Sequence, residues 1–309
     1  MMNEFKNILV AIDTRREVHP VVTESVELAQ QNGGKLHIVD VAPEFPWTVK
    51  LTMPDHEHIH NLVVKEKSES LETIAAPLRE TGLEVTTNVL EGKSSVEIIR
   101  EVTRNGHDLV MRAAKGSDSR SSAFFGNTGS RLLRQCPCSV WLVSENTRLD
   151  FKHLLACVNT SSDDVMDQEL NQRVFDLASM IQRIHKSKLS IIHSWNIWNE
   201  QMLKGRLGQE RFAEVEQKTL QVVNERLDDF LSTQQADEIN VALKKGDTDE
   251  VITEFAKSES VDLIILGTVA KSGVTGIVTG SCAEEILNQI ECSVLALKPS
   301  SFVSPVQLD

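Results

Sequence analysis

The stretches FKNILVAIDT (5–14) and FKHLLACVNT (151–160) decide the fold, because they read as two copies of one strand-forming segment. Each is a short apolar run that ends in a polar side chain, Asp13 in the first copy and Asn159 in the second. Further matches follow in the same order along the chain: KLHIVDV with KLSIIHS, Gly92 with Gly246, HDLVMRA with VDLIILG, and CSVWLV with CSVLAL. A repeat preserved in this way predicts a duplicated domain.

The length agrees with a duplication, since 309 residues at roughly 100–200 residues per domain make two domains. The polar, turn-prone stretch SENTRLD (144–150) separates the copies and places domain 1 at 1–147 and domain 2 at 148–309. Domains of this size bury enough apolar surface to fold without a disulfide or a metal. The five cysteines are odd in number and lie mostly in apolar segments, so we expect reduced core thiols.

Each copy alternates apolar strands with amphipathic helices. The strands expected in the first copy are 8–12, 36–41, 85–92, 108–113 and 139–144, and the helices are 20–32, 55–80, 94–105 and 127–135. Strands joined through helices pair in parallel, and the helices cover both faces of the sheet. The expected fold class is α/β, with two tandem doubly wound domains that each contain a five-stranded parallel sheet.

The second copy has a longer helix after its second strand. Its apolar residues recur at mostly three- and four-residue spacing: Phe212, Val215, Leu220, Val223, Leu227 and Phe230. We expect this stripe to pack on the sheet, and the alternative is a face that binds a partner.

Composition and charge exclude several classes of partner. Lys and Arg number 32 against 45 Asp and Glu, which gives a net charge of −13. This balance argues against direct nucleic-acid binding and against docking on an anionic membrane. The chain shows no apolar run long enough to span a bilayer and no secretory leader pattern, so we expect a cytoplasmic protein.

The segment GTVAKSGVTGIVTGSCAEEIL (267–287) carries the strongest functional signal. It follows the fourth strand of the second copy, and ligands of doubly wound sheets bind at the carboxyl ends of strands. Gly267, Gly273 and Gly280 allow the backbone to approach a bound group closely. Gly280 and Ser281 open a predicted helix, whose first amides face an anion placed there. The alternative is a flexible loop with an ordinary serine cap.

The spacing of this segment resembles the universal stress protein family, in its tandem two-domain type. In nucleotide-binding members, the fourth strand is followed by Gly, two residues, Gly, nine residues, and then Gly-Ser or Gly-Thr. Gly267 matches the first position, Ala270 stands at the second, and Gly280 and Ser281 match the last two. The resemblance covers nearly the whole chain and implies the adenine nucleotide alpha hydrolase-like form of the fold.

The first copy shows the same spacing but lacks the other glycine of the motif. Ala113 replaces the first glycine, Gly116 matches the second, and Gly126 and Asn127 follow nine residues later. An alanine is penalised by about 1 kcal/mol or more wherever the backbone needs a positive φ, and a factor of ten in affinity corresponds to about 1.4 kcal/mol. One missing glycine therefore weakens such a site without abolishing it.

The resemblance assigns further positions near the nucleotide. Asp13 matches the family's aspartate at the end of the first strand, near adenine and ribose, and Asn159 takes its place in the second copy. The backbone after the second strand pairs with adenine, which falls at Val41 and Ser194. We expect the better site in domain 2, for ATP or AMP with or without Mg²⁺; domain 1 is expected to be degenerate or to hold another ligand.

The resemblance implies a role in surviving stress, including resistance to DNA damage, through a nucleotide-responsive binding module. Two alternatives stay open: a scaffold without nucleotide that presents a protein-interaction face, and a weak ATPase. The sequence contains no GxSxG, HExxH or GxxxxGK[ST] motif, so it assigns no catalytic residue, and a slow ATPase is the most that we expect.

Two further features concern partners and metals. The apolar stretches SVWLVS and SVLALK would be exposed sheet edges, so we expect the two copies to pair through them, and a homodimer is the further possibility. His56, His58 and His60 resemble metal ligands, but we expect a solvated helix start and assign no metal site. His193 is expected to be a core or rim residue.

Overall fold

The computed structural model describes residues 4–114, 126–144, 151–234, 238–268, 285–286 and 289–308. The elements of the first half are β1 (Asn7–Ala11), α1 (Pro20–Asn32), β2 (Lys35–Ala42), α2 (Trp47–Thr52), α3 (His56–Glu80), β3 (Val85–Glu91), α4 (Ser94–Asn105), β4 (Leu109–Ala113), α5 (Gly126–Gln135) and β5 (Ser139–Val143). Those of the second half are β6 (His153–Cys157), α6 (Val165–His185), β7 (Lys188–Trp195), α7 (Glu200–Ser232), β8 (Ile239–Lys245), α8 (Thr248–Ser258), β9 (Leu263–Gly267) and β10 (Ser293–Leu297).

Helix ends follow local chemistry. Pro20 occupies the first turn of α1, where its missing N–H costs no hydrogen bond. Gly33 ends α1 at a φ of 61°, and its amide bonds to the carbonyl of Ala29. The repeat did not predict α2, which has only six residues and buries none of them. The long α7 is kinked at Gly208, where φ is 72°.

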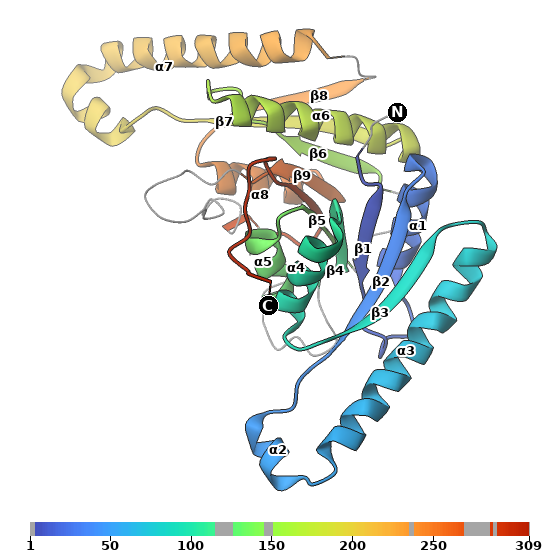
Figure 1. The fold of residues 1–309 in the computed structure, drawn as a ribbon. Coiled ribbons are helices and arrows are strands. Elements are labelled where there is room, and N and C mark those ends of the chain that lie inside the picture. The colour runs from blue at the N-terminus through green and yellow to red at the C-terminus, as the bar shows by residue number, and fades with distance from the viewer. Residues whose placement is uncertain are drawn as a thin grey trace.

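The strands form one ten-stranded sheet, in the order β3-β2-β1-β4-β5-β10-β9-β6-β7-β8. The five strands within each half are parallel, which confirms the expected α/β class. The halves join where β5 and β10 pair antiparallel, with Trp141 opposite Leu295. The expected pairing of SVWLVS with SVLALK is therefore confirmed. Figure 1 shows the resulting arrangement, with α3 and α7 at opposite ends of the molecule.

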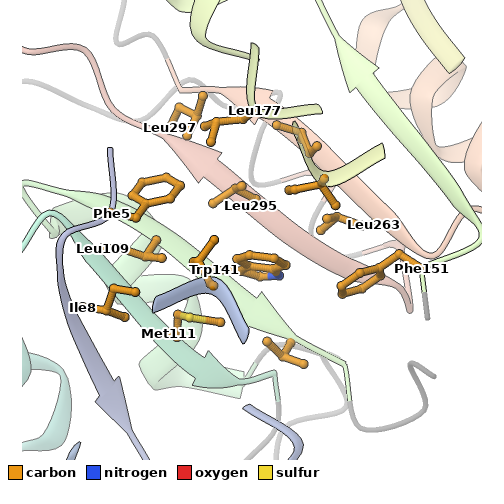
Figure 2. Packing of buried hydrophobic residues seen from close by; sticks show 14 of the residues in the cluster. Phe5, Ile8, Leu109, Met111, Trp141, Phe151, Leu177, Leu263, Leu295 and Leu297 are labelled. Atoms are coloured by element: carbon orange, nitrogen blue, oxygen red, sulfur yellow. The ribbon is translucent and has the colours of Figure 1, made fainter. Parts of the chain in front are cut away.

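Each face of the sheet carries one hydrophobic core that runs across both halves. One face is covered by α1, α3, α6 and α7, and the other by α4, α5 and α8. Figure 2 shows residues of the first core, where Trp141 of the first half lies among Leu263 and Leu295 of the second. The apolar strands are thus buried on both faces, as a parallel sheet requires.

Part of the expected stripe on α7 is solvent-exposed. Phe212, Val223 and Leu227 are buried, but Leu220 is 41% exposed. The expectation that the stripe packs on the sheet is wrong at Leu220, because this side chain belongs to none of the hydrophobic clusters that Phe212, Val223 and Leu227 join.

Polar contacts reinforce the junction between the halves. The Arg173 guanidinium on α6 donates to the Glu4 carboxylate at 2.8 Å. The buried Lys298 ammonium donates to the carbonyl of Leu133 on α5 at 2.5 Å. The C-terminal tail also packs on domain 1, since the Ser304 hydroxyl donates to the carbonyl of Gln135 at 2.7 Å. The predicted boundary between residues 147 and 148 lies outside the described residues.

Candidate functional site

Domain 2 brings three of the predicted site residues to the carboxyl ends of adjacent strands. Asn159 follows β6, Gly267 ends β9 on one side of it, and Ser194 lies near the end of β7 on the other. A Cβ atom on Gly267 would lie 3.2 Å from the Cβ of Leu170, so this position is closely packed against α6. These residues surround the point at which the order of the strands reverses, which is where the crevice of an open α/β sheet is expected.

The backbone around Asn159 is fixed by α6. Asn171 accepts from the Asn159 amide at 2.8 Å and donates to its carbonyl at 2.8 Å. The Asn159 side-chain oxygen accepts from the Ser161 amide at 3.3 Å. The residue is exposed, and its side-chain nitrogen makes no hydrogen bond within the described residues. It is therefore available to donate to a ligand.

The other polar groups of this crevice are internally bound. The His193 Nδ1–H donates to the carbonyl of Val158 at 2.9 Å, and the Nε2 atom accepts from the Ser161 hydroxyl at 3.0 Å. Burial lowers the pKa of His193, which keeps the ring neutral. His193 is thus a buried structural residue, as expected. The Ser194 hydroxyl donates to the Thr248 hydroxyl at 2.7 Å.

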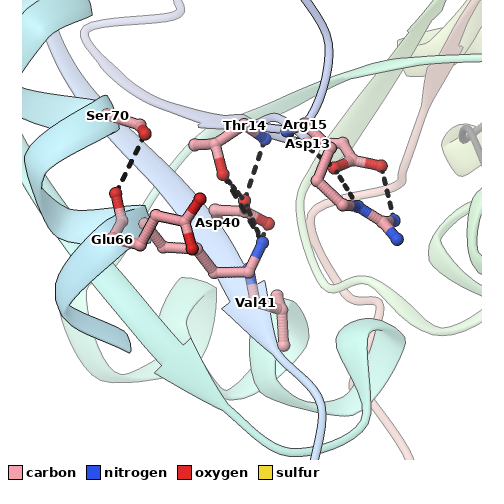
Figure 3. Close-up of polar contacts among 8 residues, drawn as sticks. Asp13, Thr14, Arg15, Asp40, Val41, Glu66 and Ser70 are labelled. Carbon is pink, nitrogen blue, oxygen red and sulfur yellow. Dashed lines mark hydrogen bonds and ion pairs between the residues drawn. The ribbon is translucent and has the colours of Figure 1, made fainter. Parts of the chain in front are cut away.

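In domain 1 the equivalent aspartate is already paired. The Arg15 guanidinium donates to both carboxylate oxygens of Asp13, each at 2.8 Å. Figure 3 shows this bidentate pair beside the Asp40 cluster. Bidentate pairing of this kind competes with any ligand that would bind the Asp13 carboxylate.

Asp40 closes the same crevice from β2. Its carboxylate accepts from the Lys67 ammonium at 2.5 Å, from the Thr14 hydroxyl at 2.6 Å and from the Val41 amide at 2.6 Å (Figure 3). Asp40 and Lys67 are only 5% and 9% exposed. The Val41 amide, expected to face adenine, is therefore bound within the protein.

Arg112, a half-buried cation on β4, lies opposite Ala11 near the end of β1. Burial lowers its pKa, while the charges of Asp13 and Asp40 oppose this effect and Arg16 adds to it. The pocket that the described residues form here, lined by Asp13, His19 and Arg112 among others, has a volume of about 20 Å³. This space holds no more than a water molecule. Arg15, Lys67 and Arg112 were not among the predicted site residues.

The remaining predicted site residues are only partly described. Ala270, Gly273, Gly280 and Ser281 of domain 2, and Gly116 of domain 1, lie outside the described residues. Gly126 begins α5 at a φ of 60° and is buried, and Asn127 beside it is exposed. The backbone conformation at Gly126 therefore favours a residue without a Cβ atom.

The histidines at the start of α3 do not meet one another. His60 Nε2 contacts Glu91 at 2.7 Å, and His56 Nδ1 contacts the carbonyl of Met53 at 2.8 Å. His58 is exposed. Within the described residues, the groups whose ligand atoms converge lie elsewhere, around His37 and around Glu24.

Comparison with known proteins identifies the class. The model of the universal stress protein family matches residues 4–144 and again 151–298. The chain therefore belongs to the universal stress protein family and contains two of its domains in tandem.

Individual relatives have the same organisation. Universal stress protein E of Escherichia coli (strain K12) is 24% identical over 330 residues, covering 100% of this chain and 98% of that protein. Universal stress protein E of Photorhabdus laumondii is 25% identical over 325 residues, covering 99% of each chain. The described helices include none long and apolar enough to cross a membrane.

Solved structures share the architecture. A functionally unknown protein from Pseudomonas aeruginosa PAO1 is similar with a TM-score of 0.74 and 21% identity, covering 96% of this chain and 94% of that one. A universal stress protein from Archaeoglobus fulgidus DSM 4304 gives a TM-score of 0.64 at 14% identity, covering 95% and 98%. At these identities the similarity shows the fold.

Proposed function

We propose that this universal stress protein acts in stress resistance as a nucleotide-responsive binding module, with its adenine nucleotide site in domain 2. The ligand is ATP or AMP, with or without Mg²⁺, held between Asn159, Ser194 and the glycine-rich segment that begins at Gly267. One observation supports this choice of domain above the others. Within the described residues the exposed Asn159 side chain has an unused donor, whereas its counterpart Asp13 is held by Arg15.

The closure of domain 1 supports the same assignment. Internal partners already occupy the polar groups of Asp13, Val41 and Asp40. Arg112 on β4 lies opposite the end of β1. A ligand there would have to break a bidentate ion pair. We therefore propose that domain 1 does not bind nucleotide at the crevice of the family.

Calorimetric titration of ATP, ADP and AMP with Mg²⁺ tests the proposal, after mass spectrometry of the purified chain for a carried-over nucleotide. Gly280→Trp should abolish binding, because an indole there fills the proposed phosphate position, and Gly126→Trp is its counterpart in domain 1. Since Gly126 has a positive φ, circular dichroism must first show that this control is folded. Full affinity in Gly280→Trp would reject the proposed site.

A second matched pair isolates the base and ribose end of the site. Asn159→Ala should weaken binding about tenfold, as expected for one lost hydrogen bond of roughly 1.4 kcal/mol, whereas Asp13→Ala should leave it unchanged. Equal losses in both variants would contradict the assignment to domain 2.

A scaffold without nucleotide is the second candidate, and the closed crevice of domain 1 favours it. It predicts no heat of binding and no carried-over nucleotide. A weak ATPase is distinguished by Mg²⁺-dependent phosphate release that Gly280→Trp removes.

A further inference from the structure

Three side chains able to bind a metal converge at the amino end of the domain 1 sheet. His37 lies on β2, Glu101 on α4, and His107 in the connection between α4 and β4. Their ligand atoms all lie within 4.8 Å of one another. Asp13 follows the carboxyl end of β1, so this cluster is separate from the crevice described above.

The histidines of this cluster have unsatisfied ring nitrogens. His107 is 6% exposed, and neither of its ring nitrogens has a hydrogen-bond partner within the described residues. His37 Nε2 is also buried and makes no well-aligned hydrogen bond there, although it lies 3.1 Å from Glu101 Oε1. The two rings are stacked, with centroids 5.4 Å apart and an interplanar angle of 12°. Buried polar atoms are nearly always satisfied, so the His107 ring, unpartnered within the described residues and stacked on His37, points to a ligand that these residues do not supply.

The carboxylate supplies the anionic donor. Glu101 is 5% exposed, and its Oε1 atom lies 3.1 Å from His37 Nε2. Zinc ligands at about 2.0–2.2 Å in tetrahedral geometry lie about 3.4 Å from one another, so this pair already has nearly the spacing of two ligands of one ion. Glu101 also lies in the last two turns of α4, close to the helix end that favours a cation.

Outer contacts orient two of these ligands. His37 Nδ1 bonds to the Thr86 hydroxyl at 2.8 Å, an arrangement that leaves the Nε2 lone pair facing the cluster when Nδ1 carries the proton. The Asn105 side-chain amide donates to Glu101 Oε1 at 2.6 Å. Metal-binding histidines and carboxylates typically have such outer partners.

We propose that His37, Glu101 and His107 form a Zn²⁺ site in domain 1, with a fourth position left for water. Two imidazoles and one carboxylate suit Zn²⁺, whereas Ca²⁺ and Mg²⁺ prefer oxygen ligands. A bound ion would tie β2 to α4 and to the connection that leads into β4. It would bind one nitrogen of the His107 ring, which has no hydrogen-bond partner within the described residues.

Zn²⁺ titration in competition with a chromophoric chelator tests the site, with the full chain stripped of metal at pH 7.5. We expect one ion per chain, with an affinity reduced at least tenfold in Glu101→Gln and in His107→Ala. Glu97→Gln on the same helix and His58→Ala at the exposed start of α3 are the matched controls and should bind as the parent does.

X-ray absorption at the zinc edge of the loaded parent chain needs no variant, so it stands even if His107→Ala fails to fold. We expect two imidazole ligands, oxygen in the remaining positions and no sulfur. Absence of binding at micromolar free Zn²⁺, a sulfur ligand, or equal affinity in the parent and Glu101→Gln would each overturn the proposal.

Discussion

Glu24 on α1 makes the stability of the protein depend on pH. Its side chain is 3% exposed, and its Oε2 atom has no hydrogen-bond partner within the described residues. Burial, followed by the charge of Glu27, raises its pKa from 4.5 to about 8. His185 at the end of α6 is the facing basic group, with Nε2 3.8 Å from Glu24 Oε1.

The sign of the effect follows from the raised pKa. The folded chain holds the Glu24 proton up to about pH 8, whereas the unfolded chain releases it near pH 4.5. The stabilisation from protonated Glu24 is therefore fully present below pH 4.5 and is lost as the pH rises through about 8. Each pKa unit corresponds to about 1.4 kcal/mol, so the loss between pH 5 and pH 7 is at most about 3 kcal/mol.

Glu24→Gln mimics the protonated acid and removes the titration. Urea unfolding followed by tryptophan fluorescence at pH 5, 6, 7 and 8 should show similar stability of parent and variant at pH 5. The variant should become more stable than the parent by up to about 1.4 kcal/mol for each further pH unit.

The control is Glu27→Gln, which removes only the smaller contribution to the Glu24 pKa. It should reduce the pH slope slightly and leave most of it. Parent and Glu24→Gln curves that stay parallel from pH 5 to pH 8 would refute the argument, because the carboxyl would then titrate alike in folded and unfolded chains.

Three further outcomes are measurable by chemical unfolding with far-ultraviolet circular dichroism. Lys67→Met should cost about 3–5 kcal/mol because it leaves the buried Asp40 charge unpaired, and adding Asp40→Asn should recover part of that loss; no recovery would show that the cost lies in packing. Trp141→Ala should cost about 3–5 kcal/mol, since the ring is 1% exposed at the junction of the two halves; a loss below 1 kcal/mol would contradict its central position. Gly267→Val should cost about 1–3 kcal/mol through its contact with Leu170, whereas a neutral result would show that α6 yields there.

Much of the fold could be predicted because the same pattern of apolar strands and helix ends occurs in both copies of the repeat. Parallel strands buried on both faces leave continuous apolar runs, and Gly33 and Gly106 mark helix ends through positive φ angles of 61° and 63°. The edge pairing followed from the cost of exposing two apolar strands. Its antiparallel direction required the structure, since either direction would have covered both edges.

The polar interior of domain 1 could not be predicted in the same way. Lys67 looks like any charge on a solvated helix until α3 is placed beside β2, where it meets Asp40. His37 is distant in the sequence from Glu101 and His107, and only the packing of α4 on the sheet brings the three side chains together. The one sequence signal was a histidine between apolar neighbours in the strand KLHIVDV.

Because β5 and β10 pair antiparallel, the strands of the two halves run in opposite directions. The carboxyl ends of β1–β5 lie on one side of the molecule and those of β6–β10 on the opposite side. The two crevices therefore face away from each other. At about 4.8 Å per strand they are also offset by about 19 Å along the sheet. A macromolecule that covers one edge therefore leaves the other accessible, and one chain can receive a small ligand on one side while it is held by a partner on the opposite side.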